Sequence, residues 1–315
     1  MAEQSTPRVD FRELINFIVE GNDDDVQRAV VENEVLHYDI LNVLDSSGLL
    51  KALVLQGGTS LRLCRGLNRF SEDLRFAGGP DFTFSKLEQI KACIEKSLRE
   101  RYGLHTYVKQ PSELYSEPDY ENIKFSKWQI GIASSLGNQN ILKEEIKIDI
   151  TNVPAYTEEV LPIRDNYPVF GGGRMPVLVR VATINEILAD KVVAFPMFAQ
   201  TIRHRDIWDI AWLQHKGARL DPEMVKVKLR DYKIDDIYEL MLEKAIDNLP
   251  SIVESKEFSD QMNKLIKRSV ADATPEKRGF KQYLLNENQK IFKLMQLALK
   301  PEPVSKNASA TEFKM

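Results

Sequence analysis

The residues best suited to chemistry in this sequence are two aspartates that each belong to a short apolar segment. Asp73 opens the segment Asp-Leu-Arg-Phe, and Asp149 is the fourth residue of Ile-Lys-Ile-Asp-Ile. Because alternate residues of a strand point to one side, Asp73 and position 75 are expected to face away from Leu74 and Phe76. Carboxylates that converge from neighbouring strands can hold the Mg²⁺ ions that activate a hydroxyl and clamp a triphosphate. The plain alternative for Asp149 is an exposed strand residue.

A glycine pair after a short apolar run is the second candidate. Gly57-Gly58-Thr59-Ser60 follows the expected strand at 52–55 and precedes a predicted helix. Glycines at such a junction let backbone N–H groups approach a phosphate, while the helix dipole and the two hydroxyls add further attraction. On its own the run more often marks a tight turn, so it predicts a phosphate-binding loop only together with the carboxylates.

Lys191 and two later aspartates form the third group. Lys191 falls in the apolar seam of its predicted helix, so it must either snorkel to water or find anionic partners. Asp206 and Asp209 share one helical face, on which Arg205 can pair with Asp209 at i,i+4. A purely structural salt-bridge helix is the alternative for these residues.

The elements that must position these groups divide into an α/β half and a helical half. Two helices are expected within 11–46 and one at 84–101, and apolar runs predict strands at 52–55, 74–76, 104–109, 122–134, 144–151 and 176–181. Only helices are expected beyond residue 183, at 183–198, 202–216, 221–231, 236–248, 251–270 and 275–299. The expected domains are 1–182 and 183–300, followed by a disordered tail at 301–315.

Composition is that of a soluble globular protein in a reducing compartment, hence the expectation of a cytoplasmic location. The 315 residues are 43% apolar and 29% charged, with two cysteines and a net charge of −4. No apolar run is long enough to span a membrane. One local exception to the acidic balance lies between Lys264 and Lys300, where nine Lys or Arg face three acids, a candidate surface for an RNA backbone.

Four motifs in this order resemble the AbiEii/AbiGii family of toxin nucleotidyltransferases, which is MenT-like. The first motif is matched by Gly57, Gly58, Thr59, Gly66, Arg69, Ser71 and Asp73. The second is matched by Asp149, the third by the helix segment Glu186 to Lys191, and the fourth by the segment Arg205 to Ile210. The resemblance covers roughly residues 50–215. It implies an α+β fold, a polymerase-β-like nucleotidyltransferase core with a mixed sheet, and a C-terminal helical domain.

The resemblance also implies an activity and its partners. Such a protein is expected to be the toxin of a toxin–antitoxin or abortive-infection (antiphage defence) system, with a cognate antitoxin. It would transfer nucleotides from an NTP to an RNA acceptor in a Mg²⁺-dependent reaction that blocks translation, with the tRNA 3′ end as the leading acceptor. A non-catalytic nucleotide-, RNA- or partner-binding module of the same fold is the alternative function. A protein-modifying nucleotidyltransferase is a third.

Roles for single residues follow from the matched motifs. Metal would be held by Asp73 and Asp149, together with the residue that the family carries at position 75, and Asp149 would also act as general base. Lys191 would neutralise developing charge, and Asp206 or Asp209 would orient Lys191 or Arg203. The nucleotide phosphates would be cradled by Gly57, Gly58, Thr59, Ser60, Arg69 and Ser71.

Position 75 departs from the family pattern. The family has an aspartate there and this chain has Arg75, whose guanidinium cannot bind a cation. Three origins are open: a natural pseudo-enzyme, a divergent enzyme, or a toxin inactivated so that cells tolerate its production. The retention of Asp73 and the other motifs favours inactivation. In that case Arg75 pairs with Asp73 and Asp149 and takes the place of the metal electrostatically.

Overall fold

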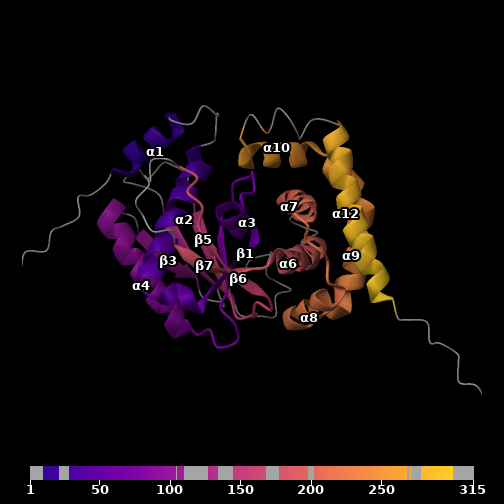
Figure 1. The fold of residues 1–315 in the computed structure, drawn as a ribbon, viewed down its shortest axis with the longest axis horizontal. Coiled ribbons are helices and arrows are strands. Elements are labelled where there is room, and N and C mark those ends of the chain that lie inside the picture. Colours follow the sequence, from indigo (N-terminus) through magenta and orange to yellow (C-terminus); the bar gives the residue numbers. More distant parts are fainter. Residues whose placement is uncertain are drawn as a thin grey trace, which may run out of the picture.

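The structure, a computed structural model, describes residues 10–20, 28–103, 105–109, 127–133, 145–167, 177–197, 202–267, 270 and 278–300. A sheet with covering helices forms one half of the molecule, and a group of helices forms the other (Figure 1). The tail predicted to be disordered, 301–315, lies outside the described residues.

The sheet has seven strands in the order β3-β4-β5-β2-β1-β7-β6. Their bounds are β1 Val54–Gln56, β2 Leu74–Ala77, β3 His105–Lys109, β4 Lys127–Ala133, β5 Glu145–Thr151, β6 Glu158–Pro162 and β7 Leu178–Ala182. The pairs β2–β5 and β1–β7 are parallel and the other pairs antiparallel, so the predicted mixed sheet is confirmed. Sequence reasoning missed β6, an edge strand that contains two acids and a proline and buries little of its surface.

Because side chains alternate along a strand, the two faces of the central strands pack against different parts of the molecule. Leu74 and Phe76 of β2, and Ile148 and Ile150 of β5, are fully buried in the first hydrophobic core. That core is covered by α1 (Phe11–Glu20), α2 (Arg28–Ser46) and α4 (Phe84–Tyr102). The intervening residues, among them Arg75, therefore face the opposite side of the sheet, toward the helical half.

The helical half forms around a second core. Its helices are α6 Ile184–Met197, α7 His204–His215, α8 Pro222–Tyr232, α9 Asp235–Glu254, α10 Lys256–Leu265 and α12 Arg278–Leu299. The predicted helix over 251–270 is wrong. Ser255 ends α9, and its hydroxyl accepts a hydrogen bond from the N–H of Phe258, so the residue caps α10 instead of continuing one helix.

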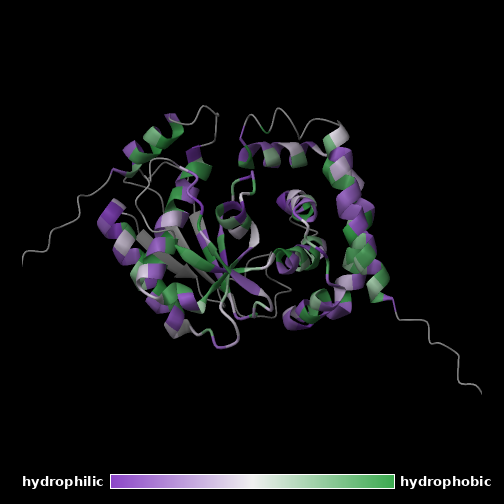
Figure 2. Ribbon diagram, in the orientation of Figure 1, coloured by the Kyte–Doolittle hydropathy of each residue, from purple (hydrophilic) through white to green (hydrophobic). Residues whose placement is uncertain are grey.

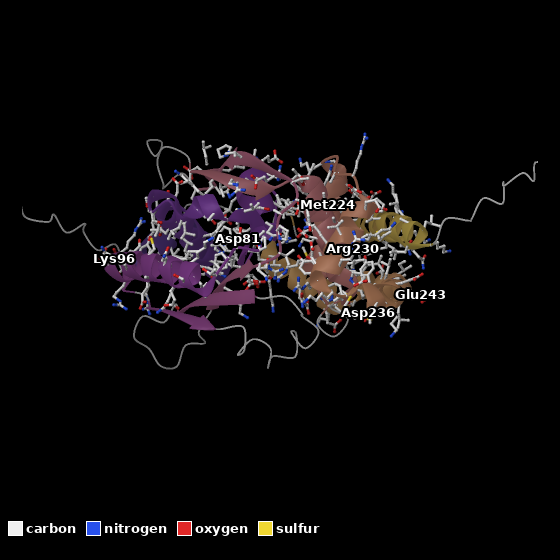
Figure 3. The ribbon with its side chains drawn as sticks, turned by 90° about the horizontal axis from the view of Figure 1, so that it is seen from below. Asp81, Lys96, Met224, Arg230, Asp236 and Glu243 are labelled. Atoms are coloured by element: carbon white, nitrogen blue, oxygen red, sulfur yellow. The ribbon has the colours of Figure 1, made fainter. Side chains whose placement is uncertain are left out.

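The outer helices are amphipathic, as surface helices must be. The hydropathy colouring alternates between hydrophilic and hydrophobic along α4 and α12 (Figure 2). Lys96 of α4 and Glu243 of α9 lie on the surface toward opposite ends of the molecule (Figure 3). Between the two halves lies α3 (Gly57–Arg65), whose Leu61 belongs to the second core and whose Leu63 belongs to the first. The residues of interest are thus held at the junction of two cores.

Candidate active site

Strand pairing brings the predicted carboxylates together. In the parallel β2–β5 ladder, Arg75 is the direct partner of Asp149. The Arg75 Nε atom lies 3.7 Å from Asp149 Oδ2, and its Nη2 atom lies 3.8 Å from Asp73 Oδ2. Asp73 immediately precedes β2. One guanidinium therefore spans both aspartates.

The glycine loop opens α3 beside this guanidinium. Gly57 has φ 73°, a left-handed conformation that favours glycine, and it is the first residue of the helix. A Cβ atom built on Gly57 would lie 3.6 Å from Arg75 Cδ, so loop and arginine are in van der Waals range. The first N–H groups of α3 have no partners within the helix, and this makes the loop suited to an anion.

The hydroxyls of the loop do not face the site as the sequence suggested. Thr59 Oγ1 lies 2.8 Å from Ser71 Oγ and 2.5 Å from the carbonyl oxygen of Asp73, and Ser60 Oγ donates to the Gly57 carbonyl at 2.8 Å. Thr59 and Ser60 are both buried. These hydroxyls are hydrogen-bonded within the protein, whereas Ser71 is partly exposed, and phosphate binding by any residue of the loop stays a prediction.

Arg69 likewise serves inside the protein. Its side chain is buried and binds both carboxylate oxygens of Asp209, with Nε at 2.6 Å and Nη2 at 2.5 Å. The guanidinium is thus engaged by Asp209, and contact of Arg69 with phosphate stays a prediction. Arg69 also explains the second glycine, because a Cβ on Gly58 would lie 2.5 Å from Arg69 Nη2.

Lys191 completes a buried ion network with both aspartates of α7. Its Nζ atom lies 2.8 Å from Asp209 Oδ2 and also contacts Asp206 Oδ1. This geometry agrees with the expectation that an aspartate orients Lys191. Burial favours a higher pKa for Asp206, but the charges of Lys191 and Arg203 outweigh it and lower the pKa to about 2. For Asp209, burial is outweighed by Arg69 and Lys191, which hold its pKa below the usual range.

Two arginines at the start of α7 add positive charge to the front of the site. Arg205 contacts Glu72 and lies 3.8 Å from Asp73, so the expected pair with Asp209 is wrong, because Arg69 and Lys191 bind that carboxylate. Burial and the nearby charge of Arg75 lower the pKa of Arg203 to about 9. The sequence analysis did not predict that Arg205 and Glu72 lie beside Asp73. The charged runs Glu72-Asp73 and Arg203-His204-Arg205 were the available signal.

The carboxylates as they stand do not fit a metal ion. Among the described residues, no group of three or more His, Cys, Asp or Glu side chains could hold one. Burial raises the pKa of Asp73, an effect that Arg75 and Arg205 partly offset. The guanidinium of Arg75 already lies against both aspartates, where it would repel a cation. The predicted metal site of Asp73 and Asp149 is therefore incomplete in this sequence.

Other predicted features lie away from the site or outside the described residues. Trp208 is a core residue, and its Nε1 donates to Asn68 Oδ1 at 3.2 Å. Lys277 lies outside the described residues, and the side chain of Arg278 is not described. Lys281 lies 3.8 Å from Glu254. Within the described part of the chain, no helix is both long and apolar enough to cross a membrane.

Comparisons with known proteins place this geometry in context. A family model described as nucleotidyl transferase AbiEii toxin of a type IV toxin–antitoxin system matches residues 39–286. The nucleotidyltransferase toxin MenT4 of Mycobacterium tuberculosis H37Rv is 17% identical over 92% of this chain and 99% of its own, with a TM-score of 0.49. JHP933 from Helicobacter pylori is 18% identical over 87% of this chain and 96% of its own, with a TM-score of 0.48. No curated protein matches the sequence.

Proposed function

The chain belongs to the AbiEii family of nucleotidyltransferase toxins, and from this premise we propose that its fold serves to move nucleotides from an NTP to an RNA acceptor. The 3′ end of tRNA is the leading acceptor. The protein would act in the cytoplasm, where its substrates are, and a cognate antitoxin would restrain it. In the present sequence, Arg75 would prevent this nucleotide transfer.

The observation that carries the proposal is the position of Arg75 between two aspartates beside the glycine loop. The side chain lies 3.8 Å from Asp73 and 3.7 Å from Asp149, and the loop at Gly57 adjoins it. A carboxylate in its place would give three acids on one face of β2 and β5, next to a helix N-terminus. This is the arrangement in which phosphoryl transfer needs mainly positioning and charge stabilisation.

The remaining residues have proposed roles that fit their surroundings. Gly57 and Gly58 would bind phosphate through their backbone, with Ser71 at the edge of the loop. Asp149, which is 5% exposed, would accept the proton of an acceptor hydroxyl. Lys191 would neutralise developing charge from a fixed position, because its contacts with Asp206 and Asp209 hold it in place. Nucleotidyltransferases of this kind generally use a divalent metal ion, and we propose Mg²⁺ for a chain whose carboxylates are complete.

The test is to restore the carboxylate with Arg75→Asp. The purified variant is incubated with Mg²⁺, each labelled NTP in turn and total tRNA, and label in RNA is measured. We expect transfer by Arg75→Asp and at least a hundredfold less by the unchanged chain, since loss of one electrostatic group at such a site costs about 10²–10³ in rate.

The control combines Arg75→Asp with Asp149→Asn, which should abolish transfer while the protein remains folded. Absence of transfer to any RNA by a folded Arg75→Asp protein would count against the proposal. Label that appears in protein instead would favour a protein-modifying nucleotidyltransferase. Growth arrest on induction of Arg75→Asp, relieved by a regulator encoded upstream, would support the toxin–antitoxin role.

The second candidate function is a non-catalytic binding module of the same fold. The contact of Arg75 with both aspartates favours this candidate. The guanidinium offsets the negative charge of the two carboxylates that would otherwise bind a metal ion. Thermal stabilisation by NTPs, measured with and without Mg²⁺ before and after Arg75→Asp, discriminates the two. Binding without turnover in both proteins would select the binding module.

A further inference from the structure

We propose that Asp190 is a positioning residue, which holds the start of the glycine loop through the side chain of Gln56. The inference rests on the proposed function in one respect, because it takes the loop at Gly57 and Gly58 as the phosphate site. It deepens that function by assigning a role to Asp190, the neighbour of Lys191 in α6.

The first step is the place of Gln56. It is the last residue of β1 and directly precedes α3, so it sets where the helix and its first N–H groups begin. With the side-chain amide oriented to satisfy both partners, its oxygen accepts a hydrogen bond from the Ala77 N–H at 2.9 Å, and its nitrogen donates to Asp190 Oδ2 at 3.3 Å. One side chain thus ties the end of β1 to β2 and to α6.

The second step is what holds Asp190. The Nζ atom of Lys228 in α8 lies 2.7 Å from Asp190 Oδ1 and 2.8 Å from Glu186 Oε1. The side chains of Lys228 and Glu186 are at most 1% exposed, and Glu186 also accepts a hydrogen bond from the N–H of Thr157. Because buried ions keep their partners, Asp190 is fixed from the helical half and can in turn fix the amide of Gln56.

The third step is that α6 holds the loop at two points. Asp190 contacts Gln56 at the start of the loop. The next residue, Lys191, belongs to the ion network that holds Arg69 against Gly58. Consecutive residues of a helix point about 100° apart, so these two side chains reach different flanks of the loop. The loop geometry therefore depends on two separate contacts of one helix.

The charges around Lys228 show how the two contributions of Asp190 can be separated. Two carboxylates share this one ammonium group, and burial raises the pKa of Asp190, an effect that Lys228 partly offsets. Asp190→Asn removes one negative charge but keeps an oxygen that can accept from Gln56. Asp190→Leu has a similar size and removes the acceptor as well. Only the leucine variant should release the loop.

The test is amide hydrogen exchange of the full chain, measured by mass spectrometry on a peptide that covers 53–61 and on a reference peptide from α9. In Asp190→Leu we expect the 53–61 peptide to exchange about tenfold faster, because loss of one hydrogen bond to a charged group shifts a local opening equilibrium by about this factor. The α9 peptide should exchange as before. In Asp190→Asn both peptides should exchange within about twofold of the unchanged chain.

Two further variants serve as controls. Gln56→Leu removes the same contact from the loop side and should accelerate exchange of the 53–61 peptide as Asp190→Leu does. It replaces Asp190→Leu if circular dichroism shows that this protein is not folded. The matched control is Glu223→Gln, because Glu223 of α8 pairs with Lys226 at the surface, is 76% exposed and should leave the loop unchanged.

Kinetics in the Arg75→Asp background give the functional readout. Addition of Asp190→Leu should raise the KM for the NTP about tenfold and change kcat less, because a loop that spends less time in its binding geometry binds phosphate more weakly. Addition of Asp190→Asn should leave the KM close to that of Arg75→Asp. A purely structural loss would lower the amount of folded enzyme, and hence the apparent kcat, without this change in KM.

Three exchange results would overturn the inference: an unchanged rate for the 53–61 peptide in folded Asp190→Leu or Gln56→Leu, equal acceleration by Asp190→Asn and Asp190→Leu, or equal acceleration of the α9 peptide. An unchanged KM in the active background would overturn it as well. Failure of the proposed function is distinguishable. If Arg75→Asp transfers no nucleotide, the enzyme is removed, while hydrogen exchange decides the role of Asp190 without any nucleotide present.

Discussion

Two groups of charged residues meet at the junction of the sheet and the helices, and they differ in contact length and burial. The front group, Asp73, Arg75 and Asp149, has contacts of 3.7 and 3.8 Å, and Arg75 and Asp73 are partly exposed. In the rear group, Arg69 and Lys191 contact Asp209 at 2.5 and 2.8 Å, and the three side chains are at most 9% exposed.

This difference indicates a structural role for the rear group and a functional role for the front group. Buried ions that have lost their water keep their partners, because removal of one partner leaves an uncompensated charge. Partly exposed ions at longer distances are screened by water and can exchange one partner for another. The rear group therefore holds Arg69 in place beside Gly58, and we expect the front group to be where a ligand or an altered residue can be accommodated.

The largest expected effect comes from removing one charge of the rear group. Asp209→Asn leaves Arg69 and part of Lys191 without an anion, and we expect a loss of about 3–5 kcal/mol in the free energy of unfolding. Urea denaturation measures it. The matched front variant is Asp73→Asn, for which we expect a loss of about 1 kcal/mol or less. Equal losses for the two variants would erase the distinction between the groups.

A second effect tests whether the backbone at Glu72, next to the front group, is also anchored by α2. His37 of α2 is buried, which lowers its pKa to about 4, and it has a hydrogen bond with the backbone of Glu72. Below about pH 6.5 the unfolded chain takes up a proton that the folded chain does not, so stability is complete above that pH and is lost as the pH falls toward 4. At 1.36 kcal/mol for each pKa unit, the fall from 6.5 to about 4 corresponds to a loss of at most about 3–4 kcal/mol.

Unfolding free energies of the unchanged chain and of His37→Gln, measured between about pH 6.5 and 4, check this expectation. The variant should show a flatter dependence on pH in that window. If the two curves are parallel, His37 is not the cause of the acid sensitivity, and anchoring of the Glu72 backbone by His37 does not contribute to stability.

The smallest of the three effects tests how rigid the rear group is. Gly58→Ala introduces a methyl group 2.5 Å from Arg69 Nη2, and we expect a cost of about 1–3 kcal/mol because Arg69 is held by Asp209. Gly279→Ala in α12 is the control, since nothing lies within 4 Å of the new methyl group, and it should be neutral or slightly stabilising. Thermal midpoints of both variants show whether Arg69 can move away from the new methyl group without a loss of stability.

Most elements of the fold could be predicted from the sequence, because apolar periodicity sets them locally. The helix expected at 84–101 is α4 (Phe84–Tyr102), and the strand expected around 74–76 is β2 (Leu74–Ala77). Errors occurred where local signals were weak or divided. β6 has the composition of an edge strand, and the break at Ser255 depends on a single capping hydroxyl.

By itself, the sequence determined the candidates: a glycine loop, aspartates on apolar strands, and a lysine in a helical seam, all within a family that matches residues 39–286. Only the tertiary structure decided which partner each one takes. Helical spacing suggested Arg205 for Asp209, but Arg69 reaches that carboxylate across 140 positions of sequence. Ion pairs between distant segments are chosen by packing and burial, which leave no periodic trace along the chain, and strand register alone placed Arg75 opposite Asp149.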